Sequence, residues 1–423
     1  MNPHDERPVP GSPEPPAPSG ALRGVRVLDL SRVLAGPLCA QMLGDHGADV
    51  VKVESPDGDD TRRWGPPYLA DGQSAYYSGI NRSKRNICVD FSCRDGQNVL
   101  WRLLEGADVV IESFKAGTMS RWGLGYEEIL AARFPRLVYC RITGYGVDGP
   151  LGGLPGYDAV LQAYAGLMSV NGEPTQDPLR VGVPIVDLVT GMLSFSGVLL
   201  ALHERHRSGA GQLVDSTLLD SALSLLHPHA AAWLADGKLP LRTGSAHAQI
   251  APYDNFSTRS GLVFVSAAND RQFTALTSVL GRPDIAVDPR FLSNSARVVN
   301  VVALRATLAA LIEQWEADAL NAELLRVGVP SVAVNNVEEA LTSPQTLHRG
   351  MLITSGDYRG IGIPIKLGRT PGAIRLTPAN KGADTRRVLE ETGYAAGEIE
   401  ALISSGVVYE THPSTARRTA ESL

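Results

Sequence analysis

Short β-rich segments alternate with helical segments between Val25 and Thr143, and this alternation limits the possible folds more than any other feature. Residues 25–30 and 48–54 are rich in valine and leucine and have the composition of strands. Residues 40–47 between them have a helical pattern that ends at a glycine. A strand, a helix and a second strand in this order predict two parallel strands joined by a right-handed crossover.

The same helix and strand unit recurs along the chain. It is found at residues 96–104 with 107–112, and again at residues 126–132 with 137–143. Repetition of this unit predicts an α/β fold with a large Rossmann-like domain built on a doubly wound sheet. Ligands of such sheets bind beyond the carboxyl ends of the strands. We therefore expect the site in the loops after Leu30, Glu54, Glu112 and Thr143.

One of these loops carries a glycine pattern known from dinucleotide-binding proteins. Residues 144–149, GYGVDG, follow a predicted strand, but the pattern binds a pyrophosphate only when its third glycine opens a helix. Residues 150–155 are PLGGLP, so no helix begins there. The segment is therefore predicted to be a glycine-rich loop, which argues against a Rossmann dehydrogenase.

A second unit is expected from His247 onward. Residues 251–266 predict a β-hairpin around the Ser260-Gly261 turn, and helical patterns follow at 270–280 and 302–325, which together suggest a smaller α+β domain. The predicted division of the chain is a disordered proline-rich segment 1–21, a large domain 22–222, a linker 223–246, a small domain 247–335, and a linker with a C-terminal return to the large domain 336–423.

Charge and composition narrow the possible functions. The formal net charge is -6 and the pI is about 5.9, whereas a nucleic-acid-binding or membrane-surface protein would have a basic excess. No secretory signal or membrane span is expected. The four cysteines lack metal-ligand spacing and are expected to be reduced core residues in a cytoplasmic protein. No metal site is predicted, and small-molecule chemistry is favoured.

Asp187 is the candidate catalytic residue. It is the only charged residue between Arg180 and His203, where an apolar segment turns into a helix. A carboxylate at a helix start accepts bonds from free N–H groups and lies near the positive end of the helix dipole, so we expect the ionised form to be favoured. An ionised, partly desolvated carboxylate can attack an activated carbonyl. The alternative is that Asp187 is simply the N-cap of the helix.

Several motifs in fixed order resemble those of the class III CoA-transferases, the CaiB/BaiF or formyl-CoA transferase type. They are GVRVLDLSRVLAGP at residues 24–37, GADVVKVE at 47–54, GDDTR at 58–62, NRSKR at 81–85 and GYD at 156–158, followed by Asp187. The resemblance runs from about residue 22 to about residue 408 and favours the nucleophile interpretation of Asp187.

The resemblance implies a fold and a reaction that the residues alone do not reveal. It implies an interlocked homodimer of two-domain chains that binds CoA esters and needs no metal or organic cofactor. The aspartate at the position of Asp187 would attack a donor thioester to give a mixed anhydride, and an enzyme–CoA thioester would then pass CoA to a second carboxylic acid. Glycine-rich backbone would stabilise the anionic intermediates.

The resemblance also implies a set of CoA-binding residues. These are Leu34, Ala35, Ser55, Lys84, Arg85, Val89, Ser113, Phe114, Lys115, Arg121, Tyr157 and Asp158. Lys84, Arg85 and Arg121 are the expected phosphate partners, because CoA carries several negative charges. The alternative for each of these cations is a solvated surface charge.

The acceptor acid is expected to be a dicarboxylate. His247 lies in GSAHAQIAPY at residues 244–253, which resembles the branch that uses succinyl-CoA and glutarate. The second carboxylate of such an acid would lie near Asp187 and would need a cationic partner. Arg32 and His247 are the candidates, with Arg180 further away.

Three other functions remain open. One is a CoA-transferase of the formyl-CoA/oxalate, malate or carnitine type. Another is an α-methylacyl-CoA racemase, although the tyrosine of Gly156-Tyr157-Asp158 stands where a racemase has a basic histidine, and tyrosine is a poor base at neutral pH. The last is a CoA-binding protein without catalytic activity.

Overall fold

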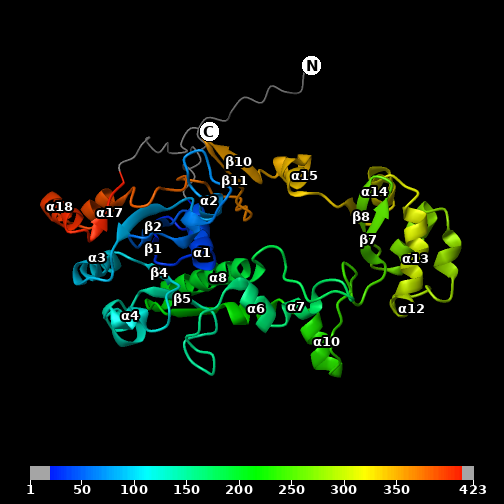
Figure 1. Ribbon diagram of the computed structural model, residues 1–423, viewed down its shortest axis with the longest axis horizontal. Helices are drawn as coiled ribbons and strands as arrows, with labels where there is room; N and C mark the ends of the chain where they lie inside the picture. Colours follow the sequence, from blue (N-terminus) through cyan, green and yellow to red (C-terminus); the bar gives the residue numbers. More distant parts are fainter. Residues whose placement is uncertain (1–19, 412–423) are drawn as a thin grey trace, which may run out of the picture. The chain divides into compact units, whose positions relative to one another are not determined.

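The computed structural model describes residues 20–411, and the proline-rich segment that was predicted to be disordered lies almost wholly outside this range. Two compact units are present (Figure 1). The first contains the chain up to Asp158, Ile185–Ser221 and the chain from Met351 on, and the second contains Ala159–Pro184 and Ala222–Gly350. Residues 159–184 thus belong to the second unit, although the sequence pattern had grouped them with the large domain.

The first unit is built on a seven-stranded sheet in the order β12-β3-β2-β1-β4-β5-β6. Its strands are β1 (Arg26–Asp29), β2 (Asp49–Glu54), β3 (Arg85–Val89), β4 (Val109–Glu112), β5 (Val138–Thr143), β6 (Leu213–Thr217) and β12 (Val408–Tyr409). All neighbours are parallel except β12, which runs antiparallel to β3. This is the predicted doubly wound sheet, and its strand order reverses direction between β1 and β4.

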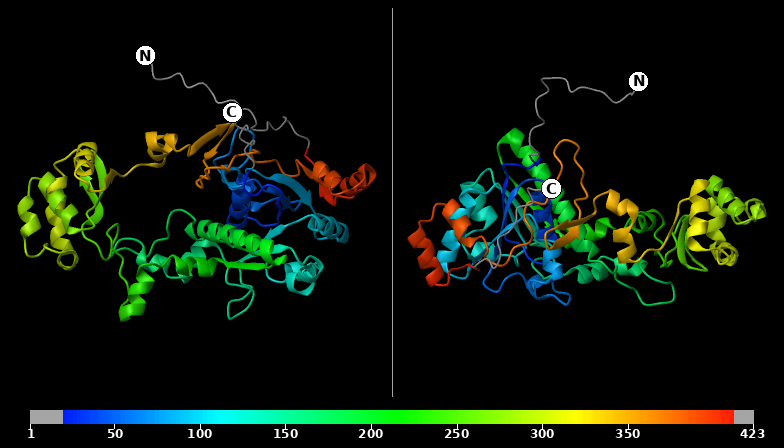
Figure 2. Two further views of the ribbon diagram at one scale, coloured as in Figure 1. Left: turned by 180° about the vertical axis from the view of Figure 1, so that it is seen from behind. Right: turned by 90° about the horizontal axis from the view of Figure 1, so that it is seen from above.

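Alternate residues of each strand face two helical layers. Leu28 and Leu30 lie in a core cluster with side chains of α3 (Arg94–Glu105), α17 (Thr385–Glu391) and α18 (Ala396–Ser404). Both views in Figure 2 show the red C-terminal helices beside α3, so the chain returns to the first unit at its end. The helices α1 (Ala35–Asp45) and α8 (Ile185–Ser208) pack against the sheet and against each other.

The contact between α1 and α8 depends on a glycine. A Cβ atom added to Gly191 would lie 2.7 Å from the Ala35 carbonyl oxygen and 3.2 Å from the Leu38 side chain. The absence of a side chain therefore lets the two helices approach closely. Gly191 stands one turn after Asp187, so the first turn of α1 lies beside the first turns of α8.

Helix α1 begins at Ala35, earlier than the pattern at residues 40–47 indicated. The extra turn includes Pro37, which a helix tolerates in its first turn because that N–H has no intrahelical partner. The strand β3 was not anticipated either, because its sequence RNICV begins with two polar residues. Both side chains are buried in polar contacts, a feature that a search for alternating apolar residues misses.

The remaining elements of the first unit are short. They are η1 (Asp60–Arg63), α2 (Ala75–Gly79), α4 (Thr118–Arg121), the π-helical turn η2 (Tyr126–Leu130), α5 (Ala131–Arg133), α9 (Leu218–Ser224), β10 (Leu352–Ser355) and β11 (Tyr358–Ile361). Residues 144–157 contain no helix, as the glycine-rich loop prediction required. The next helix, α6 (Asp158–Tyr164), begins at Asp158.

The second unit contains the predicted hairpin. Its strands are β7 (Tyr253–Thr258), β8 (Gly261–Ser266) and β9 (Ser331–Ala333), all antiparallel. Its helices are α7 (Leu167–Val170), α10 (His229–Asp236), α11 (Asp270–Val279), η3 (Pro283–Val287), α12 (Asn294–Val299), α13 (Val301–Ile312), α14 (Ala317–Arg326), α15 (Val337–Thr342) and α16 (Pro344–His348). The fully buried Arg297 donates to the carbonyl oxygens of Ala251 and Phe291, at 2.7 and 3.1 Å, and so holds together the segment before β7 and the segment before α12.

One helix qualifies the expectation that no segment is long enough to cross a membrane. Within residues 20–411, α8 alone is long and apolar enough to do so by length and composition. It packs on α1, β5 and β6 in the first unit, and the side chains of Thr190, Ser194 and Phe195 are buried there. Helices that lie inside a protein core often have the same length and apolar composition.

Candidate active site

Asp187 lies in the first turn of α8, but it is not the residue that caps this helix. Asp158 fills that position, because its Oδ2 accepts hydrogen bonds from the backbone N–H groups of Val186 at 2.7 Å and Asp187 at 3.1 Å. A second carboxylate thus satisfies the free donors at the helix start. The N-cap alternative for Asp187 is therefore wrong, and its side chain is available for another role.

The electrostatics of Asp187 also differ from the expectation. Burial of the carboxyl group and the nearby charge of Asp158 raise the pKa of Asp187 to about 7, whereas the helix start had been expected to favour the ionised form. Desolvation and a like charge outweigh the helix dipole here. At neutral pH the carboxyl group is therefore close to its midpoint, with a substantial ionised fraction that is poorly solvated.

Tyr76 lies close enough to Asp187 and Asp158 to feel their charges, and no sequence pattern had singled it out. Burial and the charges of Asp187, Asp158 and Asp59 raise the pKa of Tyr76 to about 12. Its ring packs edge-on against Trp64, with 5.0 Å between the ring centroids. The phenol therefore remains protonated at neutral pH and keeps its O–H donor.

The loops after β1 and β4 meet where the strand order reverses. The backbone N–H of Arg32 donates to Ser113 Oγ at 3.0 Å, which joins the two loops directly. Leu34 and Ala35, at the start of α1, are buried, and α1 packs on α8 through Gly191. The predicted residues of both loops therefore lie at the topological switch point, the usual ligand site of a doubly wound sheet.

A small cavity lies behind the β4 loop. Its volume is about 40 Å³, and Phe114 and Lys115 line it together with Glu112, Tyr139 and Arg141. Burial raises the pKa of Glu112 to about 7, and its Oε2 accepts the Phe114 N–H at 2.7 Å. The backbone of the β4 loop is thus fixed by a buried carboxyl group.

The other predicted CoA-binding residues fall into two groups. Ser55, Lys115, Arg121 and Tyr157 are exposed. Val89 is fully enclosed in the sheet opposite Val408, so its side chain contributes to the core. The Arg121 guanidinium group donates to Thr118 Oγ1 at 2.8 Å and has further N–H donors for a ligand.

Lys84 and Arg85 do not have the environment expected of phosphate-binding residues. Lys84 Nζ is buried and contacts Asp29 Oδ2 and the Pro37 carbonyl oxygen, both at 2.8 Å, and Asn81 Oδ1 at 2.9 Å. Burial lowers the pKa of Lys84 to about 8. Arg85 pairs with Asp49 at 2.6 Å and also with Glu391. Both cations are paired with carboxylates of the first unit and are therefore not free to bind the phosphates of CoA.

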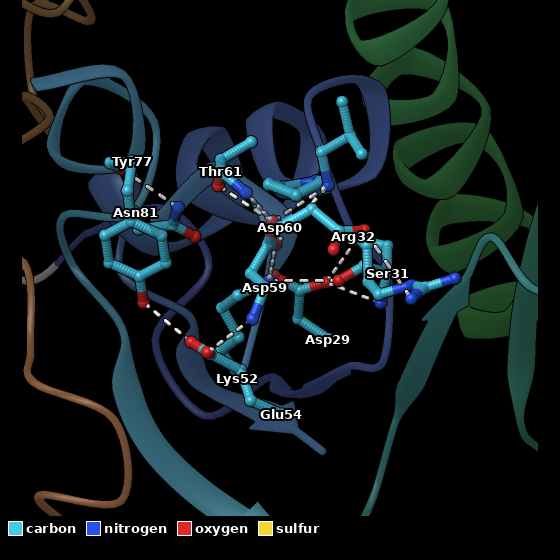
Figure 3. Close-up of polar contacts among 12 residues, drawn as sticks. Asp29, Ser31, Arg32, Lys52, Glu54, Asp59, Asp60, Thr61, Tyr77 and Asn81 are labelled. Atoms are coloured by element: carbon cyan, nitrogen blue, oxygen red, sulfur yellow. Dashed lines mark hydrogen bonds and ion pairs between the residues drawn. The ribbon is translucent and has the colours of Figure 1, made fainter. Parts of the chain in front are cut away.

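Lys84 pairs with Asp29, which belongs to a network of buried charges under the first loop; Figure 3 shows Asp29, Lys52 and Asp59 of this network. Lys52 Nζ lies 2.9 Å from the Ser31 carbonyl oxygen and 3.0 Å from Asp59 Oδ2. Ser31 Oγ donates in turn to Asp29. Buried ions that are paired and hydrogen-bonded in this way fix the backbone to which they bind. The network therefore holds the residues that connect β1 to α1.

The two residues predicted to hold the remote carboxylate belong to different units. The Arg32 guanidinium group is half exposed and lies 3.8 Å from Asp60. His247, in the second unit, accepts the Gln249 N–H at Nδ1, at 3.0 Å, and its ring packs edge-on against Tyr253. That bond places the ring proton on Nε2, from which His247 can donate to an anion.

The chain as a whole is similar to known proteins. The sequence profile of CoA-transferase family III matches residues 22–385 of the chain. The chain belongs to CoA-transferase family III. The resemblance noted in the sequence is thereby confirmed, and this family III CoA-transferase is an enzyme whose substrates are CoA thioesters and carboxylic acids.

Relatives of this family III CoA-transferase align over most of its length. A succinate–glutarate CoA-transferase of Agrobacterium fabrum is 39% identical over 90% of this chain and 96% of its own. An acetyl-CoA:oxalate CoA-transferase of Acetobacter aceti is 38% identical over 88% of this chain and 97% of its own. The crystal structure of a CaiB/BaiF family protein from Brucella suis has a TM-score of 0.81 and 41% identity, covering 88% of this chain and all of that one. The predicted α/β fold is consistent with that structure.

Proposed function

We propose that this CoA-transferase uses a covalent route in which Asp187 is the nucleophile. The observation that carries the proposal is that Asp158 caps α8 and leaves the partly buried carboxyl group of Asp187 available. The ionised form would attack the donor thioester carbonyl, breaking the C–S bond and releasing CoA thiolate, with the donor acyl group held as an anhydride on Asp187.

The later steps return the enzyme to its starting state. The CoA thiolate attacks the aspartyl carbonyl, which releases the donor acid and leaves CoA as a thioester of Asp187. The acceptor carboxylate attacks this thioester, and the thiolate released then attacks the acceptor acyl group and frees Asp187. The steps alternately convert a thioester into an anhydride and an anhydride into a thioester, so one hard step becomes several that are nearly balanced. The Tyr76 hydroxyl and the backbone N–H groups at the start of α1 are the donors available to the intermediates.

Replacing the nucleophile tests this route. Asp187→Ala should abolish CoA transfer and leave the fold intact, because the capping bonds belong to Asp158. Mass spectrometry after incubation with acyl-CoA should find an adduct on the peptide that contains Asp187 in the wild type and none in the variant. The matched control is Asp177→Ala, at an exposed aspartate in the second unit. Turnover by Asp187→Ala close to that of the wild type would rule out the covalent route.

We propose that CoA binds along the loops after β1, β2 and β4. The proposed set is Leu34, Ala35, Ser55, Ser113, Phe114, Lys115, Arg121 and Tyr157. Support comes from the bond between Arg32 and Ser113 that joins two of these loops, and from the exposed cations Lys115 and Arg121, which are free to approach phosphates. We also propose an interlocked homodimer, which rests on the resemblance to the family, and a cytoplasmic location, which rests on the expectation that the four cysteines are reduced.

For the substrates, we propose succinyl-CoA as donor and a C4 to C6 dicarboxylate such as glutarate as acceptor. The relative from Agrobacterium fabrum carries these acids in its name, whereas the relative from Acetobacter aceti is named for oxalate. The second carboxylate of the acid needs a partner that offsets its desolvation. Arg32 supplies a half-exposed guanidinium group, and His247 supplies an Nε2 donor.

The acceptor proposal is tested by comparing two acids. Arg32→Ala or His247→Ala should raise KM for glutarate by roughly tenfold or more, and should change KM for butyrate much less, because butyrate lacks the second carboxylate. Equal losses on both acids would contradict the assignment of these residues. A wild-type enzyme that prefers formate, oxalate or carnitine would contradict the choice of acceptor.

A further inference from the structure

The most unusual backbone conformation in the described part of the chain is at Val33, in the loop between β1 and α1. Its φ is +70°, in the left-handed region. A β-branched residue is rarely found there because its side chain crowds the backbone, and it remains there only when its surroundings enforce the conformation. Val33 directly precedes Leu34 and Ala35, which belong to the proposed CoA-binding set.

The buried Asp59 holds this residue. Its two carboxylate oxygens lie 3.4 and 3.3 Å from the backbone nitrogen of Val33 and accept its N–H. The same carboxylate accepts the Thr61 N–H at 3.0 Å and pairs with Lys52 at 3.0 Å (Figure 3). Asp59 is itself anchored, because its N–H donates to Glu54 Oε2 at 2.8 Å. The support for Val33 is therefore a rigid part of the interior.

The surroundings keep Asp59 ionised. Burial alone would raise the pKa of Asp59, but the Lys52 ammonium group and the hydrogen bonds from Thr61 lower it overall. Lys52 also binds the Ser31 carbonyl oxygen, two residues before Val33. Asp59 and Lys52 thus bind the backbone of the loop at two points, the N–H of Val33 and the carbonyl oxygen of Ser31.

Resting on the function proposed above, we infer that Asp59 is a positioning residue, which sets the first loop for catalysis by holding Val33 in the left-handed conformation. The direction of the chain at Val33 decides where the backbone N–H groups of Leu34 and Ala35 point. The first turn of α1 lies against α8 through the contact between Ala35 and Gly191, one turn from Asp187. Release of Val33 would therefore move these groups relative to the nucleophile.

The first test is Asp59→Asn, which keeps the size of the side chain and removes its charge. It should lower kcat roughly 10- to 100-fold, the scale of loss expected when reacting groups are displaced by about 1 Å. KM for acyl-CoA should change only a few-fold, because Lys115 and Arg121 are untouched. The control is Thr61→Val, which removes another hydrogen bond to the same carboxylate, and it should change kcat by less than about threefold.

The decisive variant adds Val33→Gly to Asp59→Asn. Glycine adopts a positive φ without crowding, so the double variant should recover most of the lost kcat. If Asp59 acted only through the general stability of the fold, adding Val33→Gly would not restore kcat. If the double variant is as slow as Asp59→Asn, or if Asp59→Asn turns over like the wild type, the inference is wrong. If Asp59→Asn does not fold, recovery of folded protein in the double variant supports it and continued failure overturns it.

A crystal structure of Asp59→Asn separates this inference from the proposed function. The φ of Val33 should become negative in that variant and remain positive in Thr61→Val, a readout that needs no turnover. An unchanged Val33 would overturn the positioning role even in an active enzyme. A wild-type protein without an adduct on Asp187 would instead refute the covalent function and leave the backbone readout intact.

Discussion

At the scale of single residues, two aspartates of the candidate site, Asp158 and Asp187, have different roles. Asp158 accepts the N–H groups at the start of α8, and Asp187, in the same turn, carries a carboxyl group whose pKa is raised to about 7 by burial and by Asp158. A carboxylate held partly desolvated is a better nucleophile than one that is bonded to backbone donors. Capping by Asp158 therefore stabilises the helix and also leaves the Asp187 carboxyl group available for the proposed reaction.

This arrangement predicts a pH dependence. In the proposed route the ionised form of Asp187 is the nucleophile, so the rate of acylation should rise with pH through about 7 and level off above it. Asp158→Asn removes the like charge but keeps a carbonyl oxygen for capping, so it should lower the pKa of Asp187 and move the acid limb down by about one pH unit. Because burial is the larger cause, part of the elevation should persist. Pre-steady-state acylation measured from pH 5 to pH 9, as rough limits, records the limb.

The position of the acid limb in Asp158→Asn shows whether Asp187 is the group that titrates. An acid limb that stays in place in Asp158→Asn would show that another group titrates. The melting temperature provides the control, since an asparagine cap is about as good as an aspartate cap and the loss of stability should be well below about 1 kcal/mol.

At the scale of elements, the packing of α1 on α8 brings the first loop close to Asp187, the proposed nucleophile. The approach is close because Gly191 has no side chain. The middle of α8 is largely apolar, and the buried side chains of the helix include Val186, Phe195 and Val198. The helix is thus held in the core while its first turn, with Asp187, reaches the carboxyl edge of the sheet.

A methyl group at this contact should have a measurable effect. Gly191→Ala places a Cβ atom 2.7 Å from the Ala35 carbonyl oxygen, closer than van der Waals contact allows, so the helices must separate. The free energy of unfolding should fall by about 1–3 kcal/mol, as for other overpacked cores. Ser196→Ala is the matched control, because Ser196 is exposed on the same helix and its replacement should stay within about 0.5 kcal/mol. Equal denaturation midpoints for both variants would contradict the close-packing argument.

At the scale of the whole molecule, large apolar side chains are exposed on both units. Leu200 on α8 is 70% exposed, and Leu234, Leu239 and Leu241 in the second unit are 76%, 81% and 78% exposed. Side chains of this size are usually covered by a partner when they gather on a surface. In the proposed dimer, a second chain would cover some of these side chains.

Sedimentation can test the dimer. At low micromolar concentration the protein should form one species of twice the 45.1 kDa chain mass. Leu234→Glu with Leu239→Glu should shift this species toward the monomer and lower activity, because two charges would be buried without partners. A stable and active wild-type monomer would contradict the interlocked architecture.

Local patterns in the sequence by themselves determined the type of sheet, the loops at its carboxyl edge and the candidate nucleophile. The alternation of strands and helices predicted the doubly wound sheet and the loops where its strands end, because side-chain periodicity depends only on nearby residues. The isolation of Asp187 in an apolar segment, together with the ordered motifs that resemble the family, singled out the candidate nucleophile. The identity of the family was later confirmed by the profile match over residues 22–385.

The tertiary structure alone decided which partner each charge has. Asp158 caps a helix that begins 27 residues later in the chain, at Ile185, and Lys84 is paired with Asp29 inside the fold instead of being free for phosphate. Tyr76 and Asp59 acquire their roles only through contacts with distant residues. The physical reason is that burial and neighbouring charge set the pKa and the availability of an ionisable group, and both depend on long-range packing that no local pattern records.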